Sequence, residues 1–225
     1  MQIVYKDENA VIVNKPTGTP SQPDPSGTPD ALTLTAELLR SLGESDSLYP
    51  VHRLDLVVGG LLLFARTKRA AAALSELVAS DGIGKIYLAV TDGEIAAARM
   101  VDWLKKDSVR SVAVAAKPDT KGAKEAILEL SPIAVKDTAR GKKQLSKIAL
   151  LTGRFHQIRA QLSLRGTPIT GDKKYSSRDS HAKAPALFSH ALSFKLFGKE
   201  ISARALPDQT VYPWSEFASL SEVEI

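Results

Sequence analysis

A carboxylate and an arginine directly precede the longest apolar run of this chain. The segment His52-Arg53-Leu54-Asp55 is followed after four residues by Gly60-Leu61-Leu62-Leu63-Phe64. A carboxylate beside a buried strand is costly to desolvate, so its pKa rises unless a cation keeps it ionised. We therefore expect a cationic partner for Asp55, either in a structural ion pair or in an activated nucleophile or base.

Two arginines are candidates for that partner. Arg53 is two residues from Asp55 and shares a face with it if the segment is extended. Arg159 is distant in sequence and follows His156 in a stretch with apolar residues at helical spacing. Residue types alone leave both the partner and its role open.

Most other chemistries find little support in the residues present. The chain contains no cysteine, which excludes disulfides, thiolate metal sites and cysteine nucleophiles. Its four histidines form no pair at helical spacing, and no phosphate loop, dinucleotide fingerprint or nucleophile elbow occurs. We expect neither a metal nor a cofactor.

The positive charge of the chain is concentrated in one half. The formal net charge is +5. Residues 136–183 hold twelve lysines or arginines against three acids, so the remainder is net negative. Such a window indicates a polyanionic partner, and nucleic acid is favoured over a membrane because no basic amphipathic helix is evident.

Short strand patterns outnumber helical ones. Thr67 and Gly82 flank the clearest helix, as an N-cap and an end signal. The predicted strands are 2–5, 10–13, 60–65, 85–91, 124–135, 145–152, 187–196 and 200–205, and the predicted helices are 31–42, 68–80 and 156–164. A basic loop, 136–143, is expected between the fifth and sixth of these strands.

This pattern predicts an α+β fold with a mixed, mainly antiparallel sheet and flanking helices. At 225 residues we expect one domain covering the whole chain, 1–225. The first residues turn charged at once, and no apolar run approaches the ~20 residues that cross a bilayer. The sequence therefore predicts a soluble, cytoplasmic protein without membrane contact.

Six motifs, in order and over most of the chain, resemble those of the RluA family of RNA pseudouridine synthases. They are Asn14–Gly18 (N-K-P-x-G), His52–Asp55 with Gly60-Leu61-Leu62 (H-R-L-D…G-L-L), Lys85–Tyr87 (K-x-Y), Gly153–Arg159 (G-R-T-H-Q-I-R), Gly166–Asp172 with Tyr175, and His190-Ala191. The co-occurrence of six motifs is far more specific than any one tetrapeptide.

The resemblance implies a role for individual residues. Asp55 matches the catalytic aspartate, and Arg53 matches the arginine that enters the RNA stack to displace the target nucleotide. Tyr87 matches the aromatic residue that packs on the flipped uracil, and Arg159 matches the arginine that pairs with the aspartate. Further candidate substrate-binding residues in the same motifs are His52, Gln157 and Ile158.

The resemblance also implies a pseudouridine synthase fold with a central RNA-binding cleft, acting as a monomer on rRNA or tRNA. No N-terminal S4-type RNA-binding module is expected, so RNA is expected to bind the basic window 136–183. The reaction breaks the C1′–N1 bond of uridine, turns the base and rejoins it through C5. A carboxylate serves either as a nucleophile at C1′ or as a base at C2′, and the sequence does not choose.

One departure lies within the key motif. Val58-Gly59 stands where the family usually has Thr-Ser, which removes two hydroxyls beside Asp55. If that turn misplaces Asp55, the chain is an RNA-binding module without activity. A third hypothesis, a nucleoside or glycoside hydrolase using Asp55, is the weakest because no clear second carboxylate accompanies it.

Overall fold

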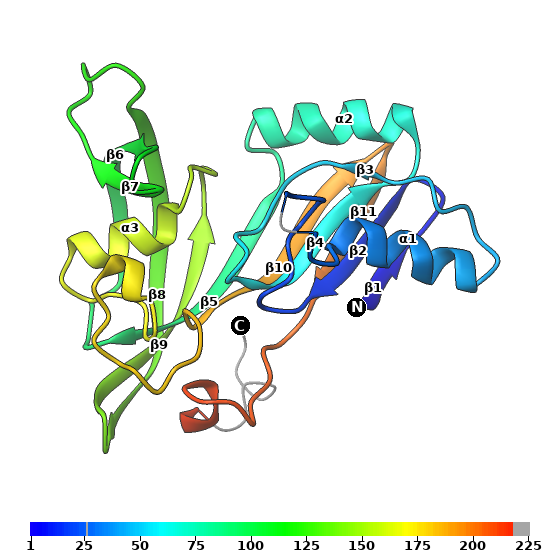
Figure 1. The fold of residues 1–225 in the computed structure, drawn as a ribbon. Helices are drawn as coiled ribbons and strands as arrows, with labels where there is room; N and C mark the ends of the chain where they lie inside the picture. The colour runs from blue at the N-terminus through cyan, green and yellow to red at the C-terminus, as the bar shows by residue number, and fades with distance from the viewer. Residues whose placement is uncertain (26, 218–225) are drawn as a thin grey trace. The chain divides into compact units, whose positions relative to one another are not determined.

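The computed structural model describes residues 1–25 and 27–217 (Figure 1). Residue contacts divide the described residues into two compact units: unit 1 comprises residues 1–25, 27–85 and 188–207, and unit 2 comprises residues 86–187 and 208–217. Each unit has its own set of paired strands. The prediction of a single domain stays a prediction.

Unit 1 is built on a mixed set of strands. β2 pairs antiparallel with both β1 and β4, β3 pairs antiparallel with β4, and β4 pairs parallel with β10, which forms a hairpin with β11. The bounds are β1 Gln2–Lys6, β2 Ala10–Lys15, β3 Tyr49–Pro50, β4 Gly59–Ala65, β10 Leu187–Leu196 and β11 Lys199–Arg204.

Strand β4 is the centre of this unit because all seven of its residues are buried. Two helices accompany the sheet, α1 (Ala31–Ser41) and α2 (Lys68–Ala79) (Figure 1). Each begins where a short polar side chain accepts a backbone N–H: Asp30 caps α1 and Thr67 caps α2. Leu74 of α2 packs in one apolar cluster with Leu61 and Leu63 of β4, which fixes the helix against the strand that follows Asp55.

Unit 2 is an antiparallel arrangement in the order β5-β9-β8-β6-β7. The helix α3 lies against β6 and β7, with Ala160 packed in a cluster with Leu104 and Ala113. The bounds are β5 Gly84–Asp92, β6 Ala98–Asp107, β7 Val112–Ala115, β8 Lys124–Thr138, β9 Gly141–Leu150, α3 Gln157–Leu164, and two 3₁₀ turns, Lys173–Tyr175 and Trp214–Glu216.

The predicted α+β class with a mixed, mainly antiparallel sheet is confirmed, and the three helices lie within two residues of their predicted ends.

The prediction of a basic loop over 136–143 is wrong. β8 continues to Thr138 and β9 resumes at Gly141, so only Ala139 and Arg140 form the turn. β6 and β7 were not predicted. The central RNA-binding cleft stays a prediction. Across 1–25 and 27–217, no helix is long and apolar enough to span a membrane.

Candidate active site

The loop that carries Asp55 leads directly into β4. Residues 51–55, all described, belong to neither a helix nor a strand. Leu54 is buried at 7% exposure, whereas Arg53 is exposed and Asp55 is half-buried. Leu54 therefore anchors the loop in the core, and its two charged neighbours lie nearer the surface.

Two hydrogen bonds shape this loop at its ends. The Val58 N–H donates to the Asp55 carbonyl at 3.0 Å and closes a tight turn after the acid. His52 Nε2 accepts the Leu63 N–H at 3.1 Å, which ties the loop to β4. Burial, helped by the positive charge of the nearby Lys85, lowers the pKa of His52 to about 4. A hydrogen bond with the backbone of Arg53 has a smaller effect in the opposite direction. His52 is therefore neutral at pH 7, as an acceptor nitrogen requires.

A buried lysine lies beside the same loop. Lys15 is fully buried, and its Nζ donates to the carbonyls of Pro16 at 3.1 Å and Thr19 at 2.8 Å. Burial lowers the pKa of Lys15 to about 8, and the negative charge of Asp55 acts in the opposite direction. Lys15 thus remains largely protonated near pH 7, as a buried positive charge close enough to Asp55 for the two charges to interact. Sequence reasoning missed this role, although Lys15 is part of the N-K-P-x-G motif.

The two glycines after Val58 are required by close packing. Gly60 has a φ of +110°, and a Cβ there would lie 2.3 Å from the backbone oxygen of Ser189 in the neighbouring strand. A Cβ on Gly59 would lie 2.9 Å from Thr17 Oγ1. Val58 itself is 2% exposed. At the unusual Val58-Gly59 pair, Val58 is therefore part of the core and Thr17 lies next to Gly59.

In unit 2, Arg159 is held by a carboxylate that sequence reasoning did not assign to it. Its Nε donates to Asp172 Oδ2 at 2.6 Å and its Nη2 to Oδ1 at 2.8 Å, and both side chains are almost fully buried. The guanidinium carbon also lies 5.0 Å from the centre of the Tyr175 ring. A two-point pair of this kind fixes the plane of the guanidinium.

The other candidates of unit 2 are buried. Gln157 Oε1 accepts from Thr152 Oγ1 at 2.8 Å and from the Arg154 N–H at 3.0 Å, which braces the start of α3. Ile158 is 5% exposed and belongs to the core. Tyr87 is 8% exposed and lies opposite Ile148 of β9.

Unit 1 thus brings together His52, Arg53 and Asp55, and unit 2 contains Tyr87, Gln157, Ile158 and Arg159. The pairing of Asp55 with Arg159 and the stacking role of Tyr87 stay predictions. In the described part of the chain, no group of three or more histidine or acidic residues is arranged to hold a metal ion.

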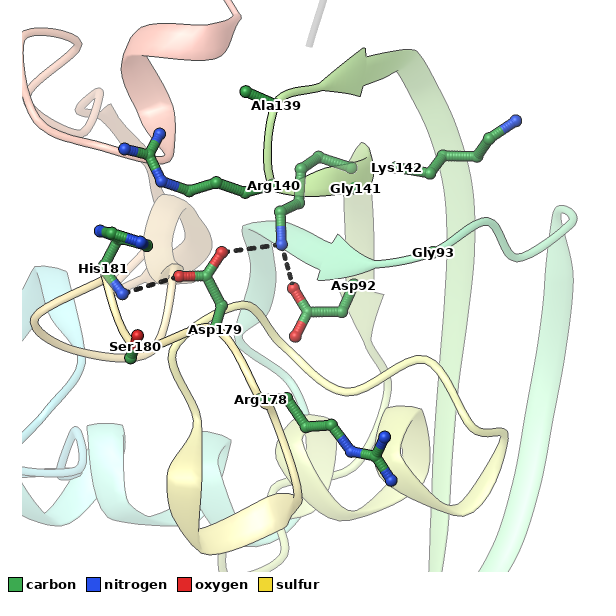
Figure 2. Close-up of a pocket in the computed structure, with 11 residues that line it drawn as sticks. Asp92, Gly93, Ala139, Arg140, Gly141, Lys142, Arg178, Asp179, Ser180 and His181 are labelled. Atoms are coloured by element: carbon green, nitrogen blue, oxygen red, sulfur yellow. Dashed lines mark hydrogen bonds and ion pairs between the residues drawn. The ribbon is translucent and has the colours of Figure 1, made fainter.

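A second polar feature, the hairpin pocket, lies in unit 2 at the tip of the β8–β9 hairpin (Figure 2). Its volume is about 590 Å³. The lining charges sum to a net positive value, because four lysines or arginines face two aspartates. The lining residues are Asp92, Gly93, Ala139, Arg140, Gly141, Lys142, Lys143, Arg178, Asp179, Ser180 and His181.

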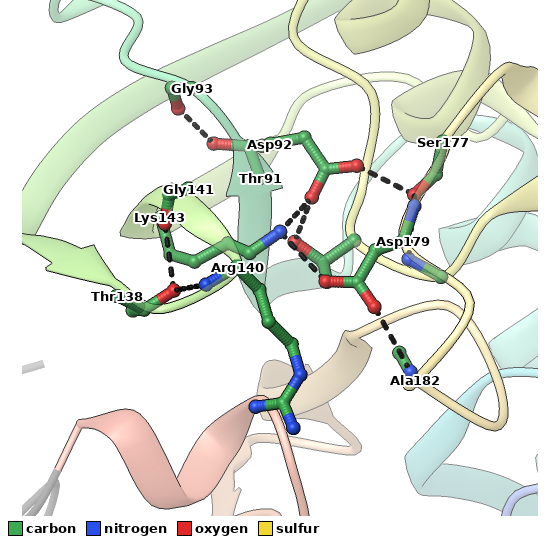
Figure 3. Close-up of polar contacts among 12 residues, drawn as sticks. Thr91, Asp92, Gly93, Thr138, Arg140, Gly141, Lys143, Ser177, Asp179 and Ala182 are labelled. Carbon is green, nitrogen blue, oxygen red and sulfur yellow. Dashed lines mark hydrogen bonds and ion pairs between the residues drawn. The ribbon is translucent and has the colours of Figure 1, made fainter.

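A buried lysine links the two carboxylates of this pocket (Figure 3). Lys143 is 2% exposed, and its Nζ lies 2.6 Å from Asp92 Oδ1 and 2.9 Å from Asp179 Oδ2. Burial alone would lower the pKa of Lys143, but hydrogen bonds to the two carboxylates raise it. Burial would raise the pKa of Asp179, but hydrogen bonds from Tyr212 and Lys143 hold it well below its usual range. Lys143 and Asp179 are therefore charged at neutral pH. We call Lys143, Asp92 and Asp179 the lysine triad.

The chain matches known proteins along most of its length. The family model described as RNA pseudouridylate synthase matches residues 9–164. A ribosomal large subunit pseudouridine synthase C of Rickettsia felis is 28% identical over 90% of this chain and 66% of its own length. A tRNA pseudouridine synthase C of Vibrio cholerae is 28% identical over 85% of this chain and 83% of its own length.

A solved structure supports the same fold. The human RNA pseudouridylate synthase domain containing 1 superposes with a TM-score of 0.75, at 22% identity, over 92% of this chain and 83% of that chain. The curated relatives extend beyond the match, since this chain spans about two thirds of the Rickettsia enzyme. Because the family model covers more than half of the chain, this chain belongs to the family of RNA pseudouridylate synthases, enzymes that isomerise uridine in RNA to pseudouridine.

Proposed function

We propose that this protein is an RNA pseudouridine synthase that uses Asp55 as its catalytic carboxylate. The observation that carries the proposal is the placement of Asp55: half-buried, at the end of a loop anchored by Leu54, beside the buried cation of Lys15. A carboxylate in this setting is held by an anchored loop and has a positive charge nearby, as a catalytic carboxylate needs.

This placement suits either route for the reaction. An ionised carboxylate close to the ribose either attacks C1′ as the uracil leaves, or removes the proton from C2′. In the first route the uracil turns and its C5 displaces the carboxylate from C1′; in the second C5 adds to C1′ and the proton returns to C2′. In both routes the C5 proton is then lost and N1 takes up a proton. Reattachment is favoured when the freed base is held in place, and Tyr87 is the residue proposed to stack on it.

The target uridine has to leave its stack before Asp55 can reach its sugar. Flipping a nucleotide costs a few kcal/mol, which a side chain inserted in its place helps to offset. Arg53 is exposed and two residues from Asp55, so we assign this role to it. Arg159, oriented by Asp172, is the arginine proposed to pair with the catalytic aspartate.

We assign RNA backbone contacts to the hairpin pocket. Arg140 and Arg178 are exposed there (Figure 2). The guanidinium of Arg140 lies 4.8 Å from the centre of the Tyr212 ring, which restricts its motion. Fixed arginines bind phosphates in two-point geometry. The Rickettsia relative is named for ribosomal RNA and the Vibrio relative for tRNA, so we propose one of these RNAs as the substrate. A cysteine-free chain suits a reducing compartment, and we propose a monomer in the cytoplasm.

The proposal is tested with unmodified rRNA and tRNA labelled with tritium at C5 of uridine, since pseudouridine formation releases that tritium. We expect release by the wild type, loss of release in Asp55→Asn, and retained RNA affinity in that variant. Asp46→Asn is the control, because Asp46 is a surface acid of the same unit paired with Arg40. Absence of release by the wild type from every RNA overturns the proposal.

The RNA-contact assignment has its own experiment. Replacing Arg140 and Arg178 with alanine should weaken RNA binding. The slope of log affinity against log salt concentration should become shallower by about two, as expected for the loss of two phosphate contacts. Lys195→Ala, an exposed lysine of unit 1, is the charge-matched control for a single site. An unchanged salt slope in the double variant contradicts the assignment.

A further inference from the structure

Ser21 contacts the residue that immediately precedes Asp55. Its Oγ donates to the Leu54 carbonyl at 2.9 Å and accepts the Leu54 N–H at 3.0 Å. Ser21 is 7% exposed, as is Leu54, so water has little access to these bonds. One hydroxyl thereby satisfies both backbone groups of Leu54, although the two residues are 33 positions apart in sequence.

The same stretch of chain holds the other side of Asp55. We call residues 15–21 the brace segment. The Gly18 N–H donates to the Leu56 carbonyl at 2.9 Å, so the residue before Asp55 and the residue after it are both bound to the brace segment. Lys15 fixes the brace segment itself through the carbonyls of Pro16 and Thr19.

These bonds matter because the loop lies outside the strand ladder. A residue within a sheet has its orientation set by pairing on both sides, whereas residues 51–55 belong to no helix or strand. A hydroxyl can donate and accept at once, which an alanine or glycine side chain cannot do. Removing the Ser21 hydroxyl leaves a buried donor and a buried acceptor at Leu54 without this partner.

We propose that Ser21 is a positioning residue for catalysis: its hydroxyl fixes the backbone of Leu54 and thereby the direction of the Asp55 carboxylate. This inference rests on the proposed role of Asp55. Ser21 does not need to contact RNA to act in this way. Since catalysis falls steeply when a reacting group is displaced by about 1 Å, loss of the two bonds slows the chemical step more than substrate binding.

The test compares steady-state kinetics of tritium release in Ser21→Ala and the wild type. We expect kcat to fall about 10- to 100-fold in Ser21→Ala, with KM within about twofold. Ser21→Cys keeps the shape but weakens both hydrogen bonds, so its kcat should lie between the two, and it serves if the alanine variant does not fold. Thr35→Val is the matched control, because Thr35 is another fully buried hydroxyl of unit 1, bonded to the Ala31 carbonyl at 2.6 Å.

Two results overturn the inference: a folded Ser21→Ala with kcat within twofold of the wild type, or a loss of activity that resides entirely in KM. Asp55→Asn is assayed in parallel. If Asp55→Asn is inactive and Ser21→Ala is fully active, only the role of Ser21 fails. If Asp55→Asn is also active, the proposed function itself fails.

Discussion

The Asp55 loop of unit 1 and the lysine triad of unit 2 position their carboxylates by different means. The Asp55 loop is held by hydrogen bonds between neutral groups: Ser21 and Gly18 bond to its backbone, and His52 of the loop accepts the Leu63 N–H of β4. One buried cation, Lys15, is nearby. In the triad, Lys143 makes direct ion pairs with Asp92 and Asp179. Neutral bonds set the direction of a group, whereas a cluster of full charges tolerates the loss of no member.

The difference indicates which carboxylate suits chemistry. Asp92 accepts from Lys143, Thr170 and Ser177, so both of its oxygens already serve the fold. The loop of Asp55 is held through the backbones of Leu54 and Leu56, and its carboxylate is the group that we propose for the reaction. Breaking each arrangement in turn should therefore affect stability in unit 2 and activity in unit 1.

The largest effect on stability is expected from Lys143→Met, which leaves two carboxylates without their shared cation. The free energy of unfolding should fall by about 3–5 kcal/mol, measured by urea denaturation. Lys142→Met is the control on the adjacent residue, because Lys142 pairs with Glu94 while nearly half exposed, and we expect a much smaller change in this variant. Equal losses in the two variants would contradict the role of the triad.

A smaller effect is expected from acid acting on His52. The pKa of His52 is about 4 in the folded chain and 6.5 when the side chain is exposed. Between pH 6.5 and pH 4, His52 is therefore protonated in the unfolded chain but not in the folded chain. The free energy of unfolding should therefore decline by about 3 kcal/mol as the pH falls from 6.5 to 4. His52→Gln, compared with the wild type by urea denaturation at both pH values, should show a shallower decline. A decline of unchanged size would rule out His52 as its source.

The smallest of the three effects concerns the turn after Asp55. Gly59→Ser places a Cβ 2.9 Å from Thr17 Oγ1, which is too close, and should cost about 2 kcal/mol together with part of the activity. Thr17→Ala alone should be milder and, combined with Gly59→Ser, should restore at least half of the lost stability. If the stability losses of Gly59→Ser and Thr17→Ala simply add in the double variant, the two side chains do not compete for the same space.

Much of the fold could be predicted because local signals were strong. Asp30 and Thr67 cap their helices as short polar side chains do, and the apolar run of β4 indicated a buried strand. β6 could not be predicted, because only Met100 and Leu104 of its residues are buried and the strand shows no clear apolar alternation. Its regular structure comes from pairing with β8. The ends of β8 and β9 were missed for the same reason: their polar residues pair with each other across a two-residue turn.

The site was predictable where its residues fall in one motif. His52, Arg53 and Asp55 adjoin in sequence, so their association in one loop follows directly. Ser21 could not be found in this way, because it lies in a Pro- and Gly-rich stretch and its partner is 33 residues distant. The pairing of Arg159 with Asp172 likewise depends on how α3 packs in unit 2, which residue types alone do not encode.

The central claim is tested most directly by measuring tritium release from C5-labelled rRNA and tRNA with the wild type and Asp55→Asn at equal RNA occupancy. The account predicts release by the wild type and none above background by Asp55→Asn, with both proteins folded and binding RNA equally well. Release by Asp55→Asn at the wild-type rate would contradict it.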